Sequence, residues 1–369
     1  MKEWSFLFRV LGKALLLFLV FNLLFMGVFS ESRAAKISLY NHLIPGRERL
    51  PFGENTQRSY NLSLVNLDAM FASHSISQPK EQHEFRIVLI GDSATWGTLL
   101  WPEETLAARL QAALQASHSQ VDIKVYNLGY PTLSLVKDLL ILEQSMDYQP
   151  DLILWLTTLE SFPLERQMDS PLLQQNPRRV LAADQRYGLR LQHIPPLPAQ
   201  WEMNLISQRR NLADLFRLQL LGFMWAATGI DQEYFTTYTP AQFDLAADEE
   251  FEGFLPSAIP EDALAFHVLD AGKKIAGETP LLFINEPILI SDGENHQIRY
   301  NFYYPRWAYD QYRADFQQQC LASQWICYDY WDLLPAQHFT NTAIHYSAQG
   351  AVELADALLA DLLASGILP

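Results

Sequence analysis

The chain has 369 residues, 49% of them hydrophobic and 12% aromatic, which suffices for one large α/β domain with insertions or for two domains. Its formal net charge of −16 argues against nucleic acid as a partner, because phosphate binding needs a basic surface. The acidity names no substrate and indicates only a well-solvated surface that repels polyanions.

Residues 1–30 differ in composition from everything that follows them. Lys2, Arg9 and Lys13 precede or interrupt an apolar stretch that continues through 14–29 and approaches the ~20 residues needed to span a bilayer. Positive charge before this stretch predicts a single-pass anchor in the cell membrane, with the N-terminus inside and the bulk of the chain extracytoplasmic. The alternative is a cleaved signal peptide, whose apolar core is typically ~7–15 residues, and the protein would then be secreted. Both interpretations export the domain.

Residues 31–84 are polar and irregular, and we expect them to form a tether and surface loops. From residue 85 onward, short apolar runs alternate with segments of helical periodicity. The expected strands are 85–90, 121–128, 151–157, 280–284 and 325–328. The expected helices are 103–116, 135–146, 263–276, 307–323 and 349–364. This alternation predicts a three-layer α/β/α domain over 85–369, with a doubly wound parallel sheet of about five strands, flavodoxin-like in type.

The alternation is interrupted between the third and fourth strands. Residues 160–260 contain Pro, Gln and Asn clusters around one apolar stretch, 212–227, which is rich in Leu, Phe and Trp. We expect a helical cap insertion here. Aromatic residues at helical spacing belong to a core more often than to a ligand site, so we expect this stretch to be packed in a core.

The chain has two cysteines, Cys320 and Cys327. Their spacing is too wide for a redox C-x-x-C motif, and they lack the neighbouring histidines of a zinc site. They form either a disulfide in an oxidising compartment or two buried thiols in the core. The sequence predicts no metal site and no cofactor.

A Gly91-Asp92-Ser93 tripeptide directly follows the first expected strand. A serine at a strand-to-helix turn is exposed at the carboxyl edge of the sheet, where α/β proteins bind ligands. Asp-Ser pairs also occur in ordinary turns and helix caps, so the tripeptide alone is weak evidence. Its position directly after a strand is what makes Ser93 a candidate nucleophile.

Two further segments are candidates for the same edge of the sheet. Asn127-Leu128-Gly129 ends the second strand, where a glycine lets the backbone approach a ligand, although a plain turn glycine explains it equally well. His345 lies just before the last helix and is a candidate general base for Ser93, if its loop returns to the carboxyl edge of the sheet.

The order and spacing of these segments resemble those of the SGNH/GDSL hydrolases, over roughly residues 85–159 and 280–365. The resemblance implies a three-layer α/β fold and ester chemistry. It implies that Ser93 attacks the ester carbonyl, that His345 accepts and returns the proton, and that the backbone amides of Ser93 and Gly129 hold the oxyanion.

The sequence departs from the family pattern in two places. Where the family has Gly-x-Asn-Asp after the third strand, this chain has Thr158-Leu159-Glu160-Ser161, so the side-chain amide donor is missing. The family acid three residues before the histidine is Thr342 here. A Ser–His dyad would result unless Asp329 or Asp332 supplies the acid, or Asn341 orients the imidazole.

The sequence therefore predicts a serine-dependent ester hydrolase or O-acyltransferase. Its expected substrate is an extracytoplasmic acyl ester, with cell-surface polysaccharide as the favoured class and lipid as the second. The alternative is a catalytically degenerate binding or scaffolding protein of the cell envelope, which has kept the fold and lost the oxyanion and acid groups. A metal-dependent phosphate-ester hydrolase is disfavoured, because no carboxylate and histidine cluster has metal-ligand spacing.

Overall fold

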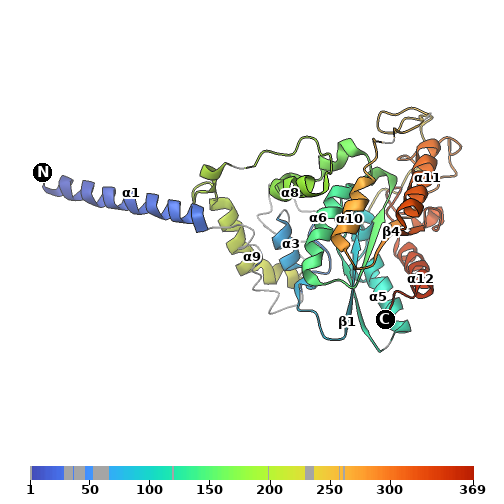
Figure 1. Ribbon diagram of the computed structural model, residues 1–369, viewed down its shortest axis with the longest axis horizontal. Helices are drawn as coiled ribbons and strands as arrows, with labels where there is room; N and C mark the ends of the chain where they lie inside the picture. Colours follow the sequence, from blue (N-terminus) through green and yellow to red (C-terminus); the bar gives the residue numbers. More distant parts are fainter. Residues whose placement is uncertain are drawn as a thin grey trace.

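A computed structural model describes residues 2–28, 36, 46–52, 66–118, 120–197, 199–228, 237–256, 258–260 and 262–369. Helix α1 (Lys2–Val28) projects from an α/β body that holds the rest of the described chain (Figure 1). Residues 4–27 of this helix are long and apolar enough to cross a membrane, and only 6% of the best window is buried. That feature is shared by membrane anchors and signal sequences.

The body is built on one parallel sheet. Its strands are β1 (Glu84–Ile90), β2 (Asp122–Asn127), β3 (Leu152–Thr157), β4 (Leu281–Asn285) and β5 (Ile326–Asp329). They are hydrogen-bonded in the order β2-β1-β3-β4-β5, and every pairing is parallel. Strands β3 and β4 are buried along their whole length, which explains their unbroken apolar sequence. The predicted fold class is confirmed, and each strand begins and ends within one or two residues of its expected bounds.

Helices cover both faces of the sheet, giving three layers (Figure 1). The main helices are α5 (Leu106–Ser117), α6 (Leu135–Ser145), α10 (His267–Ala276), α11 (Arg306–Ser323) and α12 (Ala348–Ser365). Helix α5 packs against α12, and α6 packs against α10. Helix α10 begins later than the expected residue 263, because 262–266 forms turns and an isolated bridge.

The region expected to be surface loops contains a buried helix, so that expectation is wrong where the structure describes the chain. Helix α3 (Leu67–Ser73) begins at Asn66, whose side chain accepts a hydrogen bond from the Ala69 N–H. All its residues are buried, and Phe71 stacks on Tyr148. A helix of two turns is too short for its apolar spacing to be recognised in the sequence. The remaining expected tether, 31–35, 37–45 and 53–65, lies outside the described residues.

Where the structure describes it, the interval 160–260 consists of several helices joined by irregular chain. They are η6 (Leu159–Ser161), η7 (Leu164–Asp169), α7 (Pro171–Gln175), α8 (Pro177–Tyr187), η8 (Gln200–Met203) and α9 (Arg209–Thr228). Helix α9 corresponds to the apolar stretch that we expected to be packed. Its described side chains are mostly exposed, Phe216 and Leu220 among them, so that expectation is wrong for these positions.

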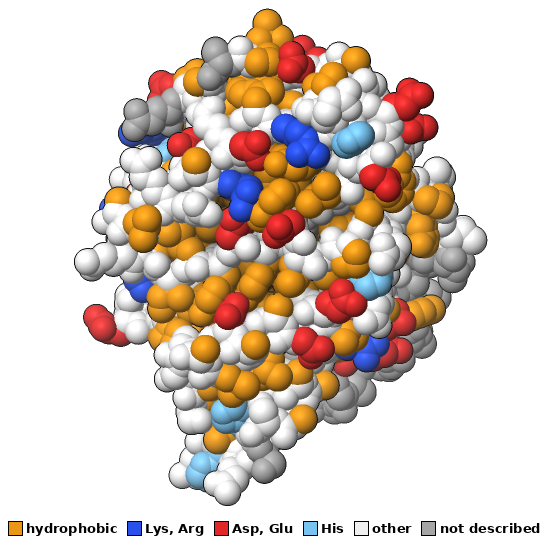
Figure 2. Space-filling view, turned by 90° about the vertical axis from the view of Figure 1, so that its right-hand side faces the viewer, with side chains coloured by type: hydrophobic (Ala, Val, Ile, Leu, Met, Phe, Trp, Pro, Cys, Tyr) orange, Lys and Arg blue, Asp and Glu red, His pale blue; other side chains and the backbone are white. Residues whose placement is uncertain are grey.

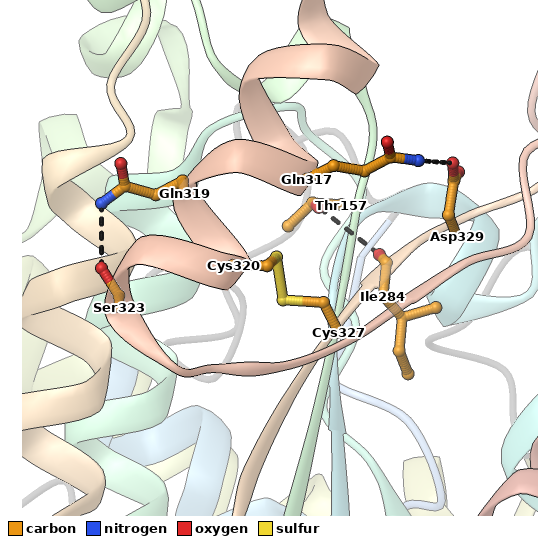
Figure 3. Close-up of a disulfide and its surroundings, with 8 residues drawn as sticks. All are labelled: Thr157, Ile284, Gln317, Gln319, Cys320, Ser323, Cys327 and Asp329. Carbon is orange, nitrogen blue, oxygen red and sulfur yellow. Dashed lines mark hydrogen bonds between the residues drawn. A yellow bond between two sulfur atoms is a disulfide. The ribbon is translucent and has the colours of Figure 1, made fainter.

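The two cysteines form a disulfide between the end of α11 and strand β5 (Figure 3). Of the two alternatives, the bonded pair is therefore observed. The bond ties the edge strand to the helix that precedes it.

Figure 2 shows the face of the body turned away from α1, on which acidic, basic and apolar side chains are interspersed. No basic patch gathers on this view, in keeping with the net charge of the chain.

Candidate active site

Ser93 stands at the junction between β1 and the short helix α4 (Ser93–Trp96). Asp92 caps this helix, with its Oδ1 accepting a hydrogen bond from the Ala94 N–H at 2.8 Å. Ser93 is therefore the first helical residue, and its own N–H has no partner within the helix. The side chain is partly exposed at the carboxyl edge of the sheet, as the sequence predicts.

The structure brings His345 to this serine across 252 positions of sequence. His345 Nε2 lies 2.7 Å from Ser93 Oγ, and His345 Nδ1 lies 2.8 Å from Asn341 Oδ1. The Thr340 hydroxyl oxygen lies 3.3 Å from the same Asn341 Oδ1. Because Asn341 Oδ1 is an acceptor, Nδ1 carries the proton and Nε2 is free to accept the Ser93 hydroxyl proton.

The protonation state of His345 suits a base at neutral pH. Burial of the imidazole lowers its pKa to about 4, because the charged form loses its hydration. Above that pH the ring is neutral and accepts a hydrogen bond from the serine. The same burial makes the imidazolium, which forms when the serine proton is transferred, less stable than in water.

The loop before α12 holds His345 by its own hydrogen bonds. The Thr340 N–H and Oγ1–H both donate to the His345 carbonyl oxygen, at 2.8 and 3.0 Å. The Thr342 Oγ1 accepts from the N–H groups of His345 and Ile344. Thr342 therefore supports the backbone of the loop, and the group at the imidazole comes from Asn341, one residue earlier.

The two aspartates considered as acids do not take that role. Asp329 accepts hydrogen bonds from Asn285 Nδ2 at 2.7 Å, from Arg313 at 2.7 and 3.1 Å and from Gln317 at 3.3 Å, the last drawn in Figure 3. Asp332 is exposed. Within the described chain both imidazole nitrogens are occupied by Ser93 and Asn341, so assigning the acid to either aspartate is wrong.

Gly129 differs from its expected role in the oxyanion hole. Its N–H donates to Asn127 Oδ1 at 3.1 Å, within the loop that follows β2. A Cβ at this position would lie 2.4 Å from the backbone N of Trp96 and 2.8 Å from the carbonyl carbon of Thr95. The glycine is thus required for the close approach of this loop to α4, and its amide is engaged in the present conformation. The Ser93 N–H remains the available backbone donor.

Glu160 occupies the position of the missing amide donor and forms an ion pair with Arg166. Arg166 also pairs with Glu252 at 2.7 Å. Burial raises the pKa of Glu160, and the Arg166 charge opposes that rise. A carboxylate paired with arginine accepts hydrogen bonds and cannot donate them. This segment therefore lacks the side-chain donor expected of an oxyanion hole.

A buried charge cluster beneath Ser93 escaped the sequence analysis. Lys137 Nζ, fully buried, donates to the carbonyl oxygens of Gly91 at 2.8 Å and Tyr130 at 3.0 Å. It thereby links the loop after β1 to the loop after β2. The available signal was a single lysine inside the apolar helix of residues 135–142.

Glu286, directly after β4, belongs to the same cluster and is 1% exposed. Burial raises its pKa well above the ordinary range, and the neighbouring carboxyl of Asp92 raises it further. Burial also raises the pKa of Asp92, against the opposing charge of Lys137. Burial and the neighbouring carboxyl therefore favour the neutral form of Glu286, while Asp92 caps α4. Lys137 and the carboxyls of Asp92, Asp138 and Glu286 thus form one buried cluster under the turn that carries the nucleophile.

A hollow of about 530 Å³ lies between η7, α7 and residues 192–195. Its lining includes Asp169, whose carboxylate lies 3.4 Å from Arg166 Nε, and three glutamines. Neither Ser93 nor His345 lines it. Among the residues the structure describes, no group of three or more His, Cys, Asp or Glu is arranged to hold a metal ion.

No family model matches the chain, and no curated protein matches it. Among solved structures, it is similar to a variant of an acetylxylan esterase from Geobacillus stearothermophilus, with 13% identity, a TM-score of 0.38 and coverage of 77% of this chain and 95% of that one. An α/β hydrolase from the metagenome of Lake Arreo gives 14% identity, a TM-score of 0.35 and coverage of 79% and 98%. A member of the lipolytic protein G-D-S-L family from Veillonella parvula DSM 2008 gives 9% identity, a TM-score of 0.36 and coverage of 75% and 96%.

At this level of similarity, the roles of Ser93 and His345 depend on the geometry of this chain alone. That geometry combines a β2-β1-β3-β4-β5 parallel sheet, a Gly-Asp-Ser turn after β1 and a histidine before the last helix. This is the arrangement that the sequence resemblance to the SGNH/GDSL hydrolases implies for the sheet, the nucleophile and the base.

Proposed function

We propose that this protein is a serine-dependent ester hydrolase or O-acyltransferase. The observation that carries the proposal is the chain of hydrogen bonds from Ser93 Oγ through His345 to Asn341 Oδ1, with distances of 2.7 and 2.8 Å. Both links fall within the range of a working nucleophile and base. A neutral amide takes the place of the carboxylate of a Ser-His-Asp triad, and it fixes the tautomer without adding charge.

The proposed reaction has two half-reactions. Ser93 Oγ attacks the acyl carbonyl while its proton passes to His345 Nε2, and the Ser93 N–H donates to the developing oxyanion. The intermediate collapses as His345 returns the proton to the leaving alcohol, which leaves an acyl-serine. His345 then deprotonates a water or a sugar hydroxyl that attacks this ester, releasing a carboxylic acid or a new ester and restoring Ser93.

The oxyanion hole is the weak part of this site. One donor, the Ser93 N–H, is available, while the Gly129 N–H bonds to Asn127 and Glu160 replaces the amide donor. Each missing donor costs roughly 3 kcal/mol of barrier in a well-built hydrolase. We therefore expect slow turnover of activated esters, faster when a bound substrate turns the Gly129 amide inward.

The same observations favour one competing function, a binding protein of the cell envelope that has lost catalysis. The two functions differ in the reactivity of Ser93. A fluorophosphonate should label Ser93 in the catalytic protein, and Ser93→Ala and His345→Ala should abolish labelling. Absence of labelling in folded wild-type protein, together with hydrolysis of p-nitrophenyl acetate no faster in wild type than in Ser93→Ala, would favour the binding function.

We further propose that the domain acts outside the cytoplasm, on an acyl ester of a cell-surface polysaccharide or, as the second candidate, of a lipid. Two features support this location: the apolar helix α1 and the disulfide, which persists in oxidising compartments. Protease added to intact spheroplasts should then degrade the domain and leave a short anchored fragment. Full protection of the domain would place it in the cytoplasm and contradict the proposal.

A further inference from the structure

Large apolar side chains are exposed on α9 and on the segment that leads into it. The exposed fractions are 67% for Trp201, 55% for Ile206, 63% for Phe216 and 67% for Leu220. Phe216 and Leu220 are four residues apart and so lie on the same face of the helix, which Leu221 extends. An exposed cluster of this size on a folded chain marks an interaction surface.

The position of this surface relative to α1 identifies what it meets. The Leu205 N–H donates to Asn22 Oδ1 of α1 at 3.0 Å, and η8 packs against the same helix. Figure 1 shows α9 beside the end of α1 that adjoins the body. Asn22 lies five residues before Gly27, where the apolar span ends, which is about 7 Å along the helix axis. Interfacial helices bury their apolar face to a comparable depth, ~5–10 Å.

The charge of α9 fits the same partner. The helix carries Arg209, Arg210 and Arg217 against Asp214, a net charge of +2 in a chain whose net charge is −16. A basic, apolar helix is attracted to anionic lipid headgroups, and a tryptophan such as Trp201 prefers the boundary between headgroups and acyl chains.

We infer that η8 and α9, residues 200–228, form a second membrane contact, lying in the headgroup region of the leaflet next to the body. This goes beyond the proposed catalytic function, and it rests on α1 being a membrane span. With α1 alone the body would swivel about one tether, whereas two contacts hold it in one orientation to the lipid surface.

Single-cysteine probes in the full chain test this, because both native cysteines are in the disulfide. Leu220→Cys, Phe8→Cys in α1 and Leu321→Cys on α11 would each be labelled with a nitrobenzoxadiazole fluorophore in liposomes of phosphatidylcholine and phosphatidylglycerol. Leu321 is 81% exposed, and Figure 1 places α11 on the far side of the body from α1. Lipids with a doxyl group on the acyl chain and aqueous iodide serve as quenchers.

We expect the doxyl lipids to quench the Leu220 probe at least twofold more than the Leu321 probe, with the opposite order for iodide. Equal quenching of these two probes by doxyl lipids would overturn the inference. Shielding of the Leu220 probe from both quenchers would overturn it too, and would indicate that a protein covers α9. The Phe8 probe distinguishes failure of the second contact at α9 from failure of the membrane span at α1. If it is lipid-quenched while Leu220 is not, the anchor stands and the second contact fails.

Discussion

Replacing Asn341 with aspartate should convert the neutral orienting group into a carboxylate without changing its size. In wild type the 2.8 Å contact fixes the His345 tautomer but gives the imidazolium no opposing charge, and burial holds the pKa of His345 at about 4. A carboxylate and an imidazolium ~4 Å apart attract by about 4 kcal/mol at an effective dielectric constant of 20. That energy corresponds to about three pKa units, part of which is offset by burying the new carboxylate.

We therefore expect Asn341→Asp to raise the pKa of His345 by one to two units, to about 5–6. We also expect it to raise kcat about 10-fold at pH 7, since ~1.4 kcal/mol of transition-state stabilisation gives a factor of ten. The assay is the pH dependence of kcat/KM on an activated ester. Wild-type activity should persist as pH falls and be lost only through about 4, whereas the variant should lose it at higher pH.

Thr342→Asp is the matched control, because it places the same carboxylate at the family position for the acid. In this structure that side chain accepts from the backbone N–H groups of Ile344 and His345, so the profile should stay at its wild-type position. Asn341→Ala should lower kcat/KM about 10- to 100-fold, since it leaves the imidazole N–H without an acceptor. A shifted profile in Thr342→Asp and an unchanged one in Asn341→Asp would refute this assignment of the orienting group.

Three further predictions concern the surroundings of the site. Gly129→Ala should destabilise the protein by about 1–3 kcal/mol in urea unfolding, because its Cβ would meet the backbone of Trp96; a change near zero would show that the loop moves freely. Burial raises the pKa of Glu286 in the folded state, so its contribution to stability is present at low pH and is lost as pH rises above the ordinary carboxyl value of 4.5, by at most ~1.4 kcal/mol per pH unit. Glu286→Gln should remove this decline in the free energy of unfolding. Reducing Cys320–Cys327 should lower the free energy of unfolding by about 2–3 kcal/mol while leaving fluorophosphonate labelling of Ser93 unchanged, and loss of labelling would show that the disulfide supports the site.

The sheet could be predicted because its strands are short, apolar and buried, and each begins and ends near polar or glycine residues. The juxtaposition of Ser93 and His345 follows from the same topology, since Ser93 directly follows β1 and the loop before α12 brings His345 to the same edge of the sheet. The partner of the imidazole stayed open, with Asn341 and two aspartates as candidates. Which of them reaches the ring depends on loop geometry that spacing does not encode.

Other features depend on tertiary contacts between distant residues. The engagement of the Gly129 amide by Asn127 requires the loop conformation. The proximity of the Glu286 and Asp92 carboxyls requires strands β1 and β4 to flank β3. The exposure of α9 was not predicted because an apolar helical face has the same sequence pattern whether it is buried in a core or exposed at a surface. The position of α9 beside α1, which is far away in sequence, is seen only in the structure (Figure 1).

The loop before α12 supplies the hydrogen bonds that orient its imidazole. Thr340 fixes the His345 carbonyl, Thr342 fixes its N–H and Asn341 fixes its tautomer, all within residues 340–345. Displacing this loop as a unit would preserve all three contacts and change the distance from His345 Nε2 to Ser93 Oγ. Grafted before the closing helix of another parallel α/β sheet, the segment would bring with it the group that fixes the tautomer of its histidine, while the pKa of the ring would depend on its burial in the new site.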